Sequence, residues 1–422
     1  MDGLVAVSST QLFDRSTVVL GAMLVVGALI AGVARRSFLS LTAVFVLAGF
    51  VLGHGVLKVI EFDPGSGLVN TLATVALVLI LFRDGLEVEY EMIQRAWRLP
   101  LRKIVLAMPI TCGLVAVVTK AVTDLTWTES FLVGALLSPT DPVLSASVVT
   151  NPRVPRLIRH SLNLESGLND GLALPAVLAL AAALNPSEHH FVWWQFVLQN
   201  VSIGFGTGLL VGFIAAKLMP RSRALRAEIS PHQKALYALG VAFLAYGLAV
   251  LPPKGNGLIA TYVCAIVLGS MRQDIRASFE GRSEDLIEVV KLAVFLVFGS
   301  LLTFKGLFGD GMAAVAIVVV ALAVARPIAV FAALAGTGTD AGTRAFMGWF
   351  GPRGVSTMTF SLLVLSEGVA QGGRIYNIAA LTVLVSILAH GATDLAGANW
   401  IAARAEQAEA RAGPGAPAST PA

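Results

Sequence analysis

This sequence carries unusually little charge. Of 422 residues, 13% are Asp, Glu, Lys or Arg and 56% are hydrophobic, whereas soluble domains contain about 25% charged residues. Cysteine is nearly absent: Cys112 and Cys264 both lie in apolar runs, which excludes a disulfide framework and predicts reduced packing residues. The formal charge of +4 does not indicate a nucleic-acid partner, because the basic residues lie in loops between apolar runs. The composition predicts an integral membrane protein.

The motifs of several pump and enzyme classes are also missing. The glycine-rich stretches 204–212 and 336–342 lack a GxxxxGK[ST] phosphate loop, which disfavours an ATP-driven pump and leaves close helix packing or a loose loop. There is no GxSxG or HExxH motif and no grouping with metal-ligand spacing. An intramembrane hydrolase would need a nucleophile positioned beside a base. The sequence therefore predicts neither an enzyme nor a resident cofactor.

Apolar runs of about 20 residues, long enough to cross a hydrocarbon layer of about 30 Å as helices, alternate with short polar loops. They predict an all-α polytopic protein whose membrane domain covers residues 1–400, followed by a disordered cytoplasmic tail over 401–422. We expect thirteen spans, the first a retained span rather than a signal peptide. Their approximate bounds are 16–34, 38–57, 67–86, 101–122, 128–149, 160–184, 192–218, 232–251, 256–271, 286–305, 311–333, 342–368 and 375–396.

The distribution of basic residues predicts the orientation in the cell membrane, plasma or inner. With the N-terminus outside and the C-terminus cytoplasmic, twenty of the 30 Lys and Arg residues fall in inner loops and six in outer loops, as the positive-inside rule requires. Four remain within or at the edge of spans, namely Arg83, Lys291, Arg326 and Arg353. Buried basic residues are costly and face a partner or a water-filled cavity; snorkelling to the interface is the other interpretation of Arg83 and Lys291.

Two predicted spans are interrupted at matching places. Span 5 contains Ser-Pro-Thr-Asp-Pro at 138–142, and span 12 contains Gly-Pro-Arg-Gly at 351–354. Proline removes a backbone donor and breaks a helix, and unpaired backbone at membrane depth is tolerated only inside protein or at a cavity. With span 7 as a linker, spans 1–6 and 8–13 form two inverted halves, each broken in its fifth span. Such paired breaks point to a transport site at the midplane.

Span 6 carries two carboxylates beside these breaks. Glu165 and Asn169 are four residues apart, as are Ser166 and Asp170, so one face of the helix is polar. A carboxylate paired with a buried arginine stays ionised, whereas an unpaired one can hold either a proton or a cation. That competition is the chemistry of an exchanger, and a channel would not need a titratable carboxyl at its centre.

Oxygen ligands for a monovalent cation such as Na⁺ are plentiful at this place. Candidates for the site are the Asp170 carboxylate, the Ser166 hydroxyl and the Thr140 carbonyl and hydroxyl, with the Asp141 carboxylate in addition. The structural alternative is a buried hydrogen-bond network that joins spans 5 and 6.

These residues carry a family likeness. Ser-Pro-Thr140-Asp141-Pro, followed 24 residues after Asp141 by Glu165-Ser-x-x-Asn169-Asp170-Gly, resembles the monovalent cation/proton antiporter family. It is most similar to the NhaP-type sodium/proton antiporters and their animal exchanger relatives. The likeness extends to Gly-Asn-Gly-Leu-Ile-Ala-Thr-Tyr at 255–262, Ala-Arg-Pro at 325–327 and the break in span 12, and so covers nearly the whole membrane domain.

The resemblance implies a homodimer in which a core domain of spans 4–6 and 11–13 moves against a dimerisation domain of the remaining spans. It implies that Asp170 carries cation and proton in turn and that Glu165 pairs with Arg326. Asp141 and Arg353 would neutralise the ends of the half-helices. Relatives with Asn-Asp at the positions of Asn169 and Asp170 tend to carry out electroneutral exchange.

Span 3 departs from the family pattern, because Phe-Arg-Asp-Gly at 82–85 replaces an acidic residue followed by small ones. The role of Arg83 and Asp84 in cation entry is therefore left open. The function expected is secondary active, electroneutral sodium/proton antiport in the lipid bilayer, with Na⁺ and H⁺ as transported partners. The alternatives are a potassium/proton antiporter of the same family and, more distantly, a cation channel or an intramembrane hydrolase.

Overall fold

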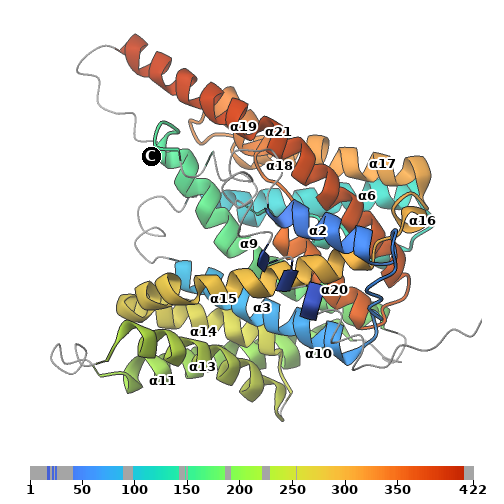
Figure 1. The fold of residues 1–422 in the computed structure, drawn as a ribbon. Coiled ribbons are helices and arrows are strands. Elements are labelled where there is room, and N and C mark those ends of the chain that lie inside the picture. The colour runs from blue at the N-terminus through green and yellow to red at the C-terminus, as the bar shows by residue number, and fades with distance from the viewer. Residues whose placement is uncertain are drawn as a thin grey trace, which may run out of the picture.

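The computed structural model describes residues 41–88, 98–141, 151–185, 192–220, 229–252 and 254–412, together with isolated positions at 17–19, 21–22, 24–25 and 148. Every regular element in these ranges is a helix, which confirms the predicted all-α class (Figure 1). The helices before the first break are α2 (Leu41–Leu52), α3 (Gly67–Glu87), α5 (Arg98–Arg102), the π-helical turn η1 (Lys103–Ala107), α6 (Met108–Val122) and α7 (Trp127–Leu136).

Most of the described helices lie between the two breaks. They are α9 (Arg156–Leu184), α10 (Trp193–Phe196), the π-helical turn η3 (Val197–Val201), α11 (Ser202–Leu218), α13 (Pro231–Val250), α14 (Gly257–Met271), α15 (Gln273–Ser300), α16 (Phe304–Leu307), α17 (Gly311–Val319), the π-helical turn η4 (Val320–Ala325), α18 (Arg326–Ala333) and α19 (Ala341–Trp349). After the second break come α20 (Val355–Ser366) and α21 (Gly372–Ala412).

Seven helical stretches in the described part of the chain are long and apolar enough to cross a membrane. They are Gly67–Glu87, Leu99–Val122, Arg156–Leu184, Trp193–Leu218, Pro231–Val250, Gly311–Ala333 and Gly372–Gln407. Three shorter apolar helices, α2, α14 and α20, lie within predicted spans. Predicted span 1 falls largely outside the described residues, as does the second half of span 5. The count of thirteen and the inverted repeats stay predictions.

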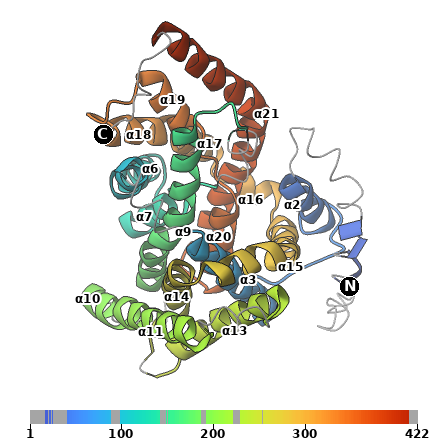
Figure 2. The same cartoon turned by 90° about the vertical axis from the view of Figure 1, so that its left-hand side faces the viewer.

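The helices pack into two groups that meet along α3, α9 and α20 (Figure 2). One group consists of α2, α3, α11, α13, α14 and α15, and within it α14 packs against α3, α11 and α13. In the other group α6 packs against α7 and α17, α18 packs against η1 and α19, and α21 packs against α17 and α20. Because α3 contacts both α9 and α20, its inward face reaches the region of the two breaks.

Close packing within the first group depends on a ladder of glycines on α11. A Cβ atom built on Gly204, Gly208 or Gly212 would lie 2.5–2.7 Å from a backbone carbonyl oxygen of the segment 256–264, which includes the cap of α14 and its first two turns. Small residues at this spacing allow two membrane helices to approach without hydrophobic driving force. The interpretation of stretch 204–212 as a helix-packing surface is therefore confirmed.

The helix starts follow from local capping. Thr126 and Glu129 form a reciprocal capping box at the start of α7, and Ser230 and Gln233 form another at α13. Asn256 caps α14 by accepting from two backbone N–H groups. Each cap satisfies donors that the first turn of a helix leaves free.

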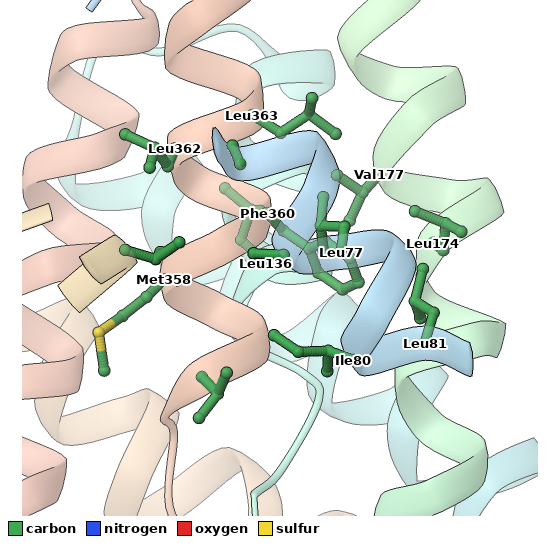
Figure 3. Close-up of a cluster of buried hydrophobic side chains, with 14 of the residues drawn as sticks. Leu77, Ile80, Leu81, Leu136, Leu174, Val177, Met358, Phe360, Leu362 and Leu363 are labelled. Atoms are coloured by element: carbon green, nitrogen blue, oxygen red, sulfur yellow. The ribbon is translucent and has the colours of Figure 1, made fainter. Parts of the chain in front are cut away.

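Apolar side chains fill the junction of α3, α9 and α20. Leu77, Ile80 and Leu81 of α3 face Leu174 and Val177 of α9 and the side chains of α20 around Phe360 (Figure 3). All of these residues are buried. This apolar packing joins the three helices at the place where the two helix groups meet.

The C-terminal helix is longer than the sequence predicts. The disordered tail was expected from residue 401, whereas α21 continues to Ala412, and the residues after it lie outside the described ones. The segment 401–412 is rich in Ala, Glu, Gln and Arg, which favour helix, and contacts from Arg404 to Asp340 and from Glu406 to Arg153 fasten it. Gly and Pro follow at 413 and 414.

Candidate functional site at the helix crossing

The two broken helices meet and hydrogen-bond to each other. Helix α7 ends at Leu136 and α19 at Trp349, and the backbone that follows each of them is not helical. Asp141 N donates to Pro352 O at 2.9 Å, and Thr357 Oγ1 of α20 donates to Leu136 O at 3.0 Å. Backbone groups that the breaks leave without helical partners are thus paired across the crossing.

Opposite charges lie at the helix ends of this crossing. The Asp141 carboxylate accepts a hydrogen bond of 2.9 Å from Val355 N, the first residue of α20. The fully buried Arg353 donates to Pro139 O at 3.3 Å and to Gly351 O at 3.0 Å, carbonyl groups that follow α7 and α19. A carboxylate at a helix N-terminus and a cation at C-terminal carbonyls are each favourable to the helix dipole.

Glu165 of α9 is held by two cations. Arg326 Nη1 lies 2.9 Å from Oε1 and Nη2 lies 3.2 Å from Oε2. Lys103 Nζ donates to Oε2 at 2.7 Å and to the carbonyl of Ser161 at 3.2 Å. The exposed fractions of the Glu165, Arg326 and Lys103 side chains are 6%, 5% and 0%. Glu165 therefore has no free oxygen for a transported ion in this arrangement.

Lys103 corrects the charge count of the sequence analysis, which includes it among the twenty basic residues of inner loops although it stands at the start of span 4 (101–122). It opens the π-helical turn η1, and Arg326 directly follows the π-helical turn η4. A π-helical turn changes the register of the helix and is common at functional sites. In the sequence, only the position of Lys103 at the beginning of an apolar run indicates that it could be buried. Its contact with Glu165 is not visible there, because that contact requires α9 to pack beside η1.

Asp170 lies one and a half turns further along α9, at the crossing. It is 5% exposed, and its Oδ2 accepts a short hydrogen bond from the Ser356 hydroxyl at the start of α20. Among the described residues no group donates a hydrogen bond to Oδ1. Ser356 is a site residue that the sequence reasoning missed, although it stands two residues after the Gly-Pro-Arg-Gly break.

Asn169 links α9 to the first break. Its Nδ2 donates to Thr140 O at 3.0 Å and to Thr140 Oγ1 at 2.9 Å, while its own Oδ1 accepts nothing from the described part of the chain. The two Thr140 oxygens that were predicted as Na⁺ ligands thus already accept one hydrogen bond each. Ser166, one turn before Asp170, is half-buried.

A cavity of about 370 Å³ lies at the C-terminal end of α3, beside the first half of α15 and residues 163–167 of α9. Its lining carries charges of both signs, and includes Arg83, Glu87, Asn163, Gly167, Arg276 and Glu280. Asp84, 5% exposed, lies beside Arg83 on α3. Within the described residues no group of three or more His, Cys, Asp or Glu side chains is arranged to hold a resident metal.

Residues 22–393 of the chain match the family described as sodium/hydrogen exchanger, transmembrane. The chain belongs to this family. Its members are transporters rather than enzymes. The matched residues include both breaks and the charged residues of α9.

Two bacterial exchangers illustrate the likeness in sequence. The chain is 25% identical over 400 residues to the K(+)/H(+) antiporter NhaP of Alkalimonas amylolytica, covering 93% of this chain and 67% of that protein. It is 26% identical over 385 residues to the K(+)/H(+) antiporter NhaP2 of Shewanella sp. strain MR-4, covering 90% and 66%. The chain thus spans about two thirds of the length of these relatives.

A solved exchanger has the same fold. The sodium proton antiporter MjNhaP1 from Methanocaldococcus jannaschii superposes with a TM-score of 0.80, covering 93% of this chain and 99% of that chain at 18% sequence identity. At this identity the match establishes the arrangement of the helices.

Proposed function

We propose that this protein is a secondary active antiporter that exchanges a monovalent cation for a proton, with Asp170 as the group that binds them in turn. The observation that carries the proposal is the Asp170 carboxylate, which is buried at the helix crossing with one oxygen bonded to Ser356 and the other without a donor among the described residues. A carboxyl in this state can take up a proton or ligate a cation, and membership of the exchanger family supports that use.

Other oxygens near Asp170 complete the proposed cation site. Thr140 lies within the first break, Ser166 lies one turn before Asp170, and the Oδ1 atom of Asn169 accepts no hydrogen bond from the described residues. Oxygen ligands of this kind suit Na⁺, which we propose as the transported ion. K⁺ is the alternative, and the names of the bacterial relatives favour it, whereas the name of the archaeal relative favours sodium.

Exchange is proposed to be electroneutral. Glu165 is held by Arg326 and Lys103, and Asp141 accepts from the N-terminus of α20. Both carboxylates are thus held by fixed donors of the protein, and the amide of Asn169 cannot carry charge. One carboxylate, Asp170, then releases one proton for each cation bound.

Alternating access is proposed to arise from movement of the two helix groups against each other. The group that holds α6, α7, α18, α19 and α21, with α9 and α20, corresponds to the expected core, and the group around α11, α13 and α14 to the dimerisation domain. A homodimer in the cell membrane, with the N-terminus outside and the C-terminus in the cytoplasm, completes the proposal.

The test is proton flux in proteoliposomes that contain the purified full-length chain. Addition of Na⁺, Li⁺ or K⁺ on one side should move protons in the opposite direction, measured with a trapped pH-sensitive dye. Asp170→Asn proteoliposomes serve as the control. Absence of cation-dependent proton movement for all three ions in folded wild-type protein would refute antiport. Flux with K⁺ alone would replace sodium by potassium in the proposal.

A further inference from the structure

Span 3 brings a second buried carboxylate close to Asp170. Asp84 has a side chain that is 7% exposed, on a part of α3 that packs against α9 and α14. Its backbone oxygen lies 3.6 Å from the position that a Cβ atom on Gly167 would take, so α3 and α9 are in contact at this point. Gly167 is three residues before Asp170 on the same helix.

Tyr262 of α14 joins the two helices. Its hydroxyl donates to Gly167 O at 2.8 Å, and its ring lies against Gly171, where a Cβ atom would overlap it. On the α3 side, a Cβ atom on Gly85 would lie 2.8 Å from Tyr262 O. The residues next to Asp84 and Asp170, Gly85 and Gly171, thus contact the same tyrosine.

Arg83 is bound to Asp84 although neighbouring residues of a helix do not face each other. Its Nε and Nη2 atoms lie 2.9 and 2.7 Å from Asp84 Oδ1, so the guanidinium folds back across the helix surface. The Arg83 side chain is 22% exposed and lines the cavity, where Glu87 Oε1 lies 3.7 Å from it. A permanently charged group therefore lies between the cavity and Asp84.

The geometry points to Arg83 as the residue that sets the stoichiometry of exchange, by acting as a tethered cation that keeps Asp84 out of the transport cycle. This inference rests on the proposed antiport function and deepens it. With the guanidinium in place, Asp84 is neutralised and Asp170 is the single carboxylate that exchanges one proton for one cation. Without it, two neighbouring buried carboxylates share the site, and two protons are released for one cation bound.

The experiment measures the null point, which is the cation gradient that just balances a fixed pH gradient across proteoliposomes. A membrane potential of either sign is set with the permeant anion thiocyanate, so that no added cation interferes. The wild-type null point should be independent of potential. The null point of Arg83→Gln should move with potential, by about tenfold in the cation gradient for each ~60 mV, as expected for one net charge per cycle.

Three further variants make the result specific. Arg83→Lys keeps the positive charge and should leave the null point independent of potential. Arg83→Gln/Asp84→Asn removes both charges and should restore independence. Arg276→Gln removes another arginine of the same cavity, bonded to Glu280 at 2.6 Å, and should not introduce voltage dependence.

Each outcome decides the matter. A potential-independent null point in Arg83→Gln overturns the inference while wild-type exchange leaves the proposed function intact. If the wild-type protein shows no exchange, the proposed antiport function and the inference about Arg83 are both refuted. If Arg83→Gln, and Arg83→Met made as a second neutral replacement, fail to elute as folded protein in gel filtration while the double variant does, an unpaired Asp84 is incompatible with the fold. The inference is then likewise overturned.

Discussion

Lys103 Nζ lies 2.7 Å from Glu165 Oε2, although the two residues are 62 positions apart and Arg326 already holds the same carboxylate. Two cations on one buried carboxylate differ from the simple ion pair that the resemblance implies. Because Glu165 keeps a partner when either cation is removed, the arrangement tolerates the loss of Lys103 better than the loss of Arg326, which contacts both oxygens.

We expect Arg326→Ala to lower the stability of the detergent-solubilised protein by about 2–5 kcal/mol, because truncation of this buried side chain leaves an unfilled volume and Lys103 as the sole partner of Glu165. Lys103→Met should cost less, and Glu165→Ala combined with Arg326→Ala should cost less than the sum of the single changes. Thermal unfolding of the variants measures this order.

Lys291→Met is the matched control for Lys103→Met. The Lys291 side chain is only 7% exposed, but its partner Glu288, at 2.7 Å, is 44% exposed. A pair with one solvated member contributes about 0–1 kcal/mol, so this variant should unfold near the wild-type temperature. Equal losses for the two lysine variants would contradict the structural role given to Lys103.

Asp170→Asn should abolish cation-driven proton movement and leave a folded protein, because an amide cannot titrate. Asp141→Asn should retain exchange, since asparagine also caps a helix N-terminus and Asp141 accepts from the backbone of α20. Proton flux in proteoliposomes compares the two. Loss in Asp141→Asn with retention in Asp170→Asn would transfer the carrier role from one aspartate to the other.

Ser356→Ala should weaken cation binding. The hydroxyl donates to Asp170 Oδ2, and a hydrogen bond to a charged group contributes about 1.5–3 kcal/mol. We therefore expect the cation concentration for half-maximal exchange to rise by a factor of about 10 to 150. Ser356→Thr keeps the donor and should behave more like the wild type. Ser361→Ala is the control on the same helix, because that buried hydroxyl donates to Met358 O within α20. An equal effect of Ser361→Ala would mean that the loss concerns the helix.

Gly208→Ala should destabilise the protein by about 1–3 kcal/mol, as overpacking does, because the added Cβ would lie 2.5 Å from Ala260 O. Gly206→Ala, two residues earlier on α11, meets nothing within 4 Å and replaces an exposed helical glycine. It should be neutral or slightly stabilising. Thermal unfolding of the two variants tests this packing. Equal unfolding temperatures for Gly208→Ala and Gly206→Ala would contradict close packing of α11 on α14.

Much of this protein is determined by the sequence alone, because the bilayer excludes most alternatives. An apolar run long enough to cross the bilayer is a helix, and a charge inside it needs a partner. Proline accompanied by a second proline or by glycines interrupts such a helix, whereas the single Pro175 leaves α9 continuous. Asp170, Glu165 and Arg326 therefore stand out against their surroundings, and the breaks at 138–142 and 351–354 are visible without any coordinates. The all-α class and the exchanger family follow from the same features.

The tertiary structure alone decided which of these groups meet. Ser356 reaches Asp170 across 186 positions and Asp141 accepts from Val355 across 214, distances in sequence over which no periodicity carries information. Lys103 looked like a loop residue because an apolar run can begin one turn earlier or later, and only the packing of η1 beside α9 buries it. The fold-back of Arg83 onto Asp84 likewise depends on the cavity beside α3, which several helices form together.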